Sequence, residues 1–247
     1  MNTYLILIIV LVIFALLFIK NPNYNSVSTE YYTYGQCSDN PMNSCSPTSG
    51  YEPIFDPGAW NNNNFIEDSH NCYAYALNDI NDDLAKLCEH GECRYINPQP
   101  GHYCGMTKRV NYENTTCEKL DERAKCDNPH MLDSTFDSTC PEGYYKIGLT
   151  VNPGKTYHWY RQGKNGYWDH KDGGREANNI DASGNLIIDP QYANRDYTNQ
   201  DGSNYTEWCK FYCIPSNEHD HTYYARNDYY KDKLHYQAEY SNSVPEQ

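Results

Sequence analysis

The chain has 247 residues, a formal net charge of −14 and a mean hydropathy of −0.89. This length fits one domain with appendages or two small domains. The acidic excess disfavours nucleic acid and anionic membrane surfaces as docking partners, because both need a basic footprint. Tyrosine is abundant, with 26 residues against 6 phenylalanines, and this composition is typical of half-buried β surface.

The N-terminus predicts a membrane anchor. Residues 4–19 carry no charge, and with the three preceding residues they form a helix of about 28 Å, enough for a bilayer core. A cleaved signal peptide is the alternative, but the basic n-region is missing. Lys20 favours a cytosolic body by the positive-inside rule. The cysteines favour a body on the lumenal or extracellular side, and possible glycosylation at Asn114 and Asn204 agrees with this placement. We therefore expect a single-pass membrane protein with its C-terminal domain on that side, or a protein of a virion membrane.

Composition divides the rest of the chain. Residues 21–65 are rich in Asn, Ser, Tyr and Pro and indicate a stalk or extended arm without regular periodicity. Residues 66–215 contain the periodic segments and are expected to form the main domain, with a cysteine-rich insertion at 88–140. Residues 216–247 form a polar, Tyr-rich arm whose aromatic residues suit contact with a partner protein.

The eleven cysteines indicate disulfides and therefore an oxidising compartment. Because the count is odd, at least one thiol has no partner within the chain. With Cys72 set aside, the rest form groups of two, six and two, and each group can pair within itself. The outer groups are Cys37 with Cys45 and Cys209 with Cys213. Parity therefore indicates Cys72 as the free thiol.

An amphipathic helix is predicted to begin beside Cys72. Apolar residues recur at steps of four and three, at Tyr73, Leu77, Ile80, Leu84 and Leu87. Asp68, Ser69 or Asn71 can cap its start, and His90 with Gly91 can end it. Cys72 then lies in the first turn, where the helix dipole favours a thiolate. The alternative is a small buried hydrophobic residue.

A β-hairpin is predicted between residues 156 and 174. Aromatic and polar residues alternate on both sides of a GKNG turn, which places His158 on one strand and His170 on the next. The two imidazoles are then neighbours on one face. One can act as general base toward a thiol while the other fixes its tautomer. The alternative is a pair of surface or packing residues.

Together these segments resemble the NlpC/P60 branch of papain-like cysteine hydrolases. The stretch NCYAYAL is similar to the family's cysteine-bearing helix start, and YHWYRQ with GYWDHK to its histidine-bearing strands, with 12 residues from His158 to His170. The resemblance implies an α+β fold, a helix packed on an antiparallel sheet. It implies Cys72 as nucleophile, His158 as base and His170 as orienting residue. Bulky strand residues replace the family's small ones, which would narrow the cleft.

No metal or other cofactor is expected. Cys209 and Cys213 with His219 and His221 do not have a common closed zinc spacing, so a disulfide is the preferred interpretation. Residues 181–189 are interpreted as a turn, because a calcium loop starting at Asp181 would need a glycine at its position 6 and a glutamate at its position 12, and both are missing.

Two functions remain open. The first is a membrane-anchored cysteine amidase or peptidase acting through Cys72, His158 and His170. The second is a catalytically inactive structural or interaction protein that keeps the hydrolase scaffold and contacts neighbouring proteins of an assembled capsid, shell or envelope. The bare anchor and stapled polar body resemble membrane proteins of large DNA viruses.

Overall fold

The computed structural model describes residues 36–40, 42, 44–93, 97–106 and 108–216. These residues belong to the second of two units, Met1–Tyr34 and Gly35–Gln247. All eleven cysteines and both hairpin histidines lie within the described part. The anchor expected at residues 1–20 and the arm expected at 216–247 lie outside it, except for residue 216.

No helix in the described part is both long and apolar enough to cross a membrane.

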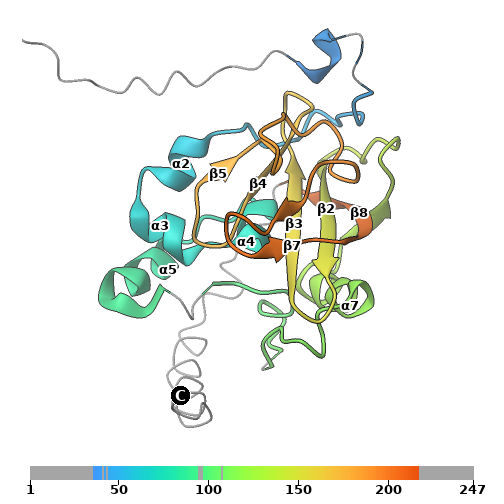
Figure 1. Ribbon diagram of the computed structural model, residues 1–247. Coiled ribbons are helices and arrows are strands. Elements are labelled where there is room, and N and C mark those ends of the chain that lie inside the picture. The colour runs from blue at the N-terminus through green and yellow to red at the C-terminus, as the bar shows by residue number, and fades with distance from the viewer. Residues whose placement is uncertain (1–35, 41, 43, 94–96, 107, 217–247) are drawn as a thin grey trace, which may run out of the picture. The chain divides into compact units, whose positions relative to one another are not determined.

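A six-stranded antiparallel sheet forms the centre of the described unit (Figure 1), with strand order β1-β8-β2-β3-β4-β5. The strands are β1 Leu132–Ser134, β2 Tyr144–Asn152, β3 Thr156–Gln162, β4 Trp168–Lys171, β5 Ala177–Asn178 and β8 Glu207–Pro215. A separate hairpin pairs β6 Asp196–Tyr197 with β7 Ser203–Asn204. The α+β class is confirmed, and so is the hairpin of β3 and β4.

Short helices surround this sheet. They are η1 Cys37–Asp39, α2 Pro57–Asn61, α3 Asn64–Ser69, α4 Cys72–Ala76, α5 Asp82–Leu87, the π-helical η2 Cys88–Glu92 and α7 Cys117–Asp127. Helix α4 packs on β3 and β4, α7 on β2, and α2 on β5. Helix α2 lies in the segment 21–65, where no helix was expected. This segment is also hydrogen-bonded to the main domain, because the Ser46 hydroxyl donates to the Phe136 carbonyl.

The single helix predicted from Tyr73 to Leu87 is wrong, because the chain breaks between α4 and α5. Asn78 has a φ of 54°, the left-handed region that ends a helix. The side chain of Asn81 then caps α5, accepting from the amides of Asp83 and Leu84. Ile80 lies in this break and is 38% exposed, so it does not continue the apolar stripe.

Strand β3 is buried on both faces. On one face Trp159 packs beside Tyr73 of α4, with ring centroids 5.4 Å apart. On the other face Tyr160 packs in a cluster with Trp168 and Phe211. Burial on both faces explains why large aromatic residues occupy consecutive positions.

Five disulfides use ten of the cysteines, and Cys72 is the free thiol, as predicted. The pairs are Cys37–Cys45, Cys88–Cys93, Cys104–Cys126, Cys117–Cys209 and Cys140–Cys213.

The expected pairing of Cys209 with Cys213 is wrong. Both lie on β8, where four residues of strand span about 13 Å, roughly twice the Cα separation that a disulfide allows. Each is bonded instead to a cysteine of the segment 88–140, which fastens this segment to the sheet. The zinc interpretation of these two cysteines is excluded, because their sulfurs are in disulfides.

Candidate functional site

Helix α4 begins at the free thiol because Asn71 caps it. The Asn71 Oδ1 accepts from the amides of Tyr73 and Ala74, each at 3.1 Å. Its Nδ2 donates to the Pro98 carbonyl at 2.5 Å, which ties the helix start to the segment that follows η2. Of the three caps predicted from the sequence, Asn71 is the one used, and Cys72 occupies the first helical position.

The Cys72 thiol is buried against the edge of β3. It is 6% exposed, and its Sγ lies 4.0 Å from the Tyr157 carbonyl oxygen. Burial raises the pKa of Cys72 to about 12, although the backbone amides of Trp159 and Tyr73 act in the opposite direction. The expectation that the helix start favours a thiolate is therefore wrong, because desolvation outweighs the amides of a helix of five residues.

The two histidines form a hydrogen-bonded chain with a defined direction. His158 Nε2 lies 2.8 Å from His170 Nδ1, and His170 Nε2 lies 3.0 Å from the Ile180 carbonyl oxygen. A carbonyl can only accept, so His170 carries its proton on Nε2. A neutral His170 then has a lone pair on Nδ1, and His158 must donate from Nε2. His158 Nδ1 is left unprotonated.

Both imidazoles are neutral at physiological pH. Each is 1% exposed, and burial lowers the pKa of both, that of His158 to well below 6.5. Within the described residues His158 Nδ1 is buried without a hydrogen-bond partner. Its nearest charged neighbour is Asp172, whose Oδ1 lies 3.9 Å away. Nδ1 of His158 is thus a buried, unprotonated nitrogen that can accept a proton.

Two tyrosines of the β6–β7 region cover the histidines. Tyr205 stacks on His158 with ring centroids 4.9 Å apart and planes 28° apart. The ring centroid of Tyr197 lies 5.9 Å from that of His170. The Tyr205 hydroxyl also donates to Asp172 Oδ1 at 3.2 Å. In Figure 1, β7 lies in front of β3.

Helix α4, which carries the thiol, and the two imidazoles lie on opposite faces of β3. Helix α4 packs on the face that carries Trp159, whereas His158 points from the opposite face toward Tyr205. The Cys72 Sγ contacts the backbone of Tyr157, the residue directly before His158. Asp172 is a shared neighbour, because its charge raises the pKa of Cys72 and its carboxylate faces His158 Nδ1. The catalytic roles of the three residues stay predictions.

Lys171 also belongs to this region, although it was not predicted from the sequence. Its side chain is fully buried, and its Nζ donates to the backbone carbonyls of Glu67, His70 and Gly173. The His70 carbonyl directly precedes the cap of α4, so Lys171 holds the start of this helix against the strand that carries His170. Burial lowers the pKa of Lys171 to about 8. The signal available in the sequence was that Lys171 directly follows His170, a histidine predicted to point inward.

One group of possible metal ligands lies close together in the described part, namely Asp68, Cys88 and Cys93. The two cysteines are bonded to each other, so neither can supply a thiolate. This group therefore does not form a metal site.

The described unit is thus a disulfide-stapled α+β protein with a free, buried thiol at the start of α4 and a hydrogen-bonded histidine pair on β3 and β4. No protein-family model and no solved structure matches the chain. Insoluble matrix shell protein 1 of Ruditapes philippinarum is 34% identical over 143 residues, which cover 57% of this chain and 80% of that protein. The chain belongs to the family of this shell protein.

Proposed function

We propose that the protein is a cysteine hydrolase of the NlpC/P60-like type, an amidase or peptidase that forms an acyl-enzyme on Cys72. The observation that carries this proposal is the order Ile180–His170–His158, which leaves His158 Nδ1 unprotonated and without a partner in the described part. A buried imidazole held in one tautomer by a second residue is the arrangement of a general base.

The proposed step begins from a neutral thiol and a neutral imidazole. The Cys72 sulfur attacks the carbonyl carbon of the substrate while its proton moves to His158 Nδ1, and His170 keeps the imidazole oriented through the 2.8 Å hydrogen bond. The C–N bond then breaks, and the same proton passes to the leaving amine. Water, deprotonated by His158, hydrolyses the thioester and restores the thiol.

The electrostatics support base-assisted attack rather than a standing thiolate–imidazolium pair. Burial raises the pKa of Cys72 and lowers that of His158, so both groups are uncharged before the reaction. The five disulfides support action in an oxidising compartment. We keep the predicted anchor at residues 1–20 and a body on the lumenal or extracellular side as parts of this proposal.

Acyl transfer from p-nitrophenyl acetate tests the proposal, because Cys72 is the one thiol that the disulfides leave free. We expect mass spectrometry to find a single acetyl thioester at Cys72 in the native protein, followed by turnover. His158→Gln should slow acetylation by roughly 10²–10⁴-fold, while the exposed control His130→Gln should leave the rate unchanged. An unacylated Cys72 in the native wild-type protein, or a His158→Gln rate equal to wild type, would contradict the proposal.

A second candidate is supported by the family relationship. The related protein is named as an insoluble matrix shell protein, and the burial of Cys72 also suits a packing residue. In this case the chain is an inactive structural component that contacts neighbouring proteins of a shell, capsid or envelope. Two results together would favour this candidate: Cys72 is not acylated in the wild-type protein, and Cys72→Ala self-associates at the same protein concentration as the wild type.

A further inference from the structure

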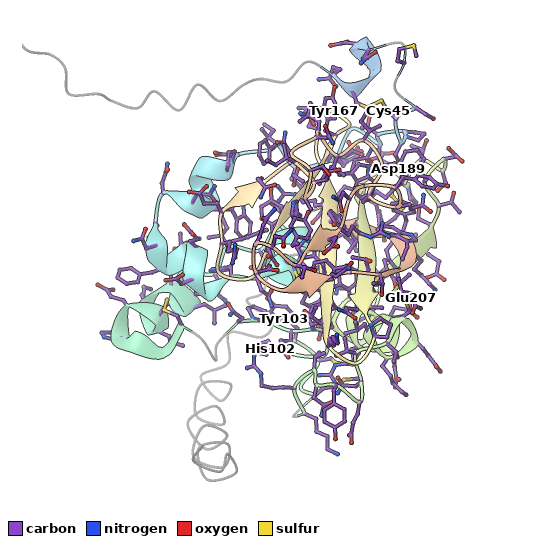
Figure 2. All side chains as sticks on the ribbon, viewed as in Figure 1. Cys45, His102, Tyr103, Tyr167, Asp189 and Glu207 are labelled. Carbon is purple, nitrogen blue, oxygen red and sulfur yellow. A yellow bond between two sulfur atoms is a disulfide. The ribbon has the colours of Figure 1, made fainter. Side chains whose placement is uncertain are left out.

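We propose that a basic cavity beside α7 binds the carboxyl terminus of a peptide. The cavity has a volume of about 30 Å³, which is room for about two water molecules or one carboxylate group. Its polar lining consists of Asn97, Gln99, His102, Lys108, Arg109 and Arg123. Figure 2 labels His102 on this segment, next to Tyr103.

The charge of the lining is opposite to that of the chain. Three of the described lining residues are cationic and none of those described is a carboxylate, although the chain has 33 acidic residues against 19 Lys and Arg. A concave group of cations in an acidic protein favours an anionic ligand over general solubility. The planar guanidinium of Arg123 also matches the two oxygens of a carboxylate.

Arg123 brings a buried charge to the cavity. It is 8% exposed, and its Nε and Nη2 donate to the neutral carbonyls of Pro100 and Lys108, each at 2.6 Å. Asp127 acts on it electrostatically, but no ion pair among the described residues includes Arg123. Burial lowers the pKa of Arg123, so an anion in the cavity stabilises this side chain.

Asn97 indicates that the anion belongs to a peptide. Its Oδ1 is shielded from solvent and has no hydrogen-bond partner in the described part of the chain. This acceptor needs a donor, and the last amide N–H of a peptide lies next to its terminal carboxylate. A peptide end therefore offers a carboxylate for the cations and, next to it, an amide donor for Asn97.

Two interactions link neighbours of the cavity to the region of the candidate nucleophile. The Pro98 carbonyl accepts from Asn71, the residue before Cys72. Tyr157, whose carbonyl contacts the thiol, experiences the charges of Cys72, Arg109 and Arg123. If the proposed hydrolase function holds, on which this last step rests, the substrates are peptides with a free carboxyl end.

Binding to the full chain tests the cavity by itself, with N-acetylglycine, its methylamide and inorganic phosphate as probes. Side-chain NMR signals of Arg123 report occupancy during each titration. We expect saturable binding of N-acetylglycine and none of the uncharged methylamide. Lys108→Gln and Arg109→Gln should each raise the dissociation constant by roughly threefold to tenfold, while the exposed control Lys155→Gln should not change it.

Each outcome decides one part of the proposal. Equal binding of the methylamide, tighter binding of phosphate, or unchanged affinity in both variants would overturn the carboxylate site. N-acetylglycine binding without acylation of Cys72 would keep the site and contradict the hydrolase. Acylation of Cys72 without N-acetylglycine binding would keep the hydrolase and contradict the site.

Discussion

Alkylation of Cys72 by iodoacetamide should be slower in the folded protein than in the unfolded one. Burial raises the pKa of this thiol from 9.0 to about 12, which reduces the thiolate fraction near neutral pH by about a thousandfold. The more basic thiolate is intrinsically more nucleophilic and recovers about 15–30-fold. The folded protein should therefore react about 30–60-fold more slowly, before any steric protection.

The assay compares native protein with protein in concentrated urea, both without reductant. Because the other ten cysteines stay in disulfides, one label per chain reports Cys72, and Cys72→Ser is the blank. The native rate should keep rising with pH beyond 10. A native rate equal to or above the unfolded rate, or one that reaches a plateau near pH 7, would refute the argument that desolvation dominates at this thiol.

Three further predictions concern stability. Removing the disulfide Cys117–Cys209, which closes a loop of 92 residues, should lower the free energy of unfolding by about 4–5 kcal/mol according to the chain-entropy relation. Removing Cys88–Cys93, which closes a loop of 5 residues, should lower it by about 2 kcal/mol. Urea unfolding of the variants with both cysteines replaced by serine measures the two losses. Arg161→Met leaves the buried carboxylate of Asp169 unpaired and should destabilise the fold by roughly 3–5 kcal/mol in the same assay. Replacing Asp169 by a neutral residue in the same protein should recover part of this loss. Burial lowers the pKa of His70, His158 and His170, the histidines that are fully buried in the described part, so the unfolded chain binds more protons than the folded one below about pH 6.5. The free energy of unfolding should therefore fall as the pH drops below this value, by up to about 1.4 kcal/mol per pH unit for each histidine. Thermal melts that show higher stability at pH 5 than at pH 7 would contradict this sign.

Local patterns predicted the elements that local chemistry determines. The hairpin that brings His158 and His170 together follows from alternation on both sides of a short turn, and the start of α4 follows from an Asn cap. The free state of Cys72 was predicted from the odd count and from the grouping of the cysteines along the chain, although two of the disulfides cross those groups.

Features that depend on distant partners could not be predicted from the sequence. The break between α4 and α5 depends on the ring of His70, whose Nε2 accepts from the Asn81 amide. The disulfides of Cys209 and Cys213 depend on segments more than 70 residues away. Lys171 is buried because three backbone carbonyls from two segments meet at its ammonium group. The raised pKa of Cys72 likewise results from tertiary burial and not from its position in a helix.

The protonation pattern of the two histidines tests the central claim most directly. Long-range ¹H–¹⁵N correlation spectra of imidazole-labelled protein at neutral pH report which ring nitrogen carries each proton. We predict that His158 and His170 are both neutral with the proton on Nε2, so that Nδ1 of His158 is bare. A proton on Nδ1 of His158 would contradict the claim that this imidazole is held ready to accept the proton of the Cys72 thiol.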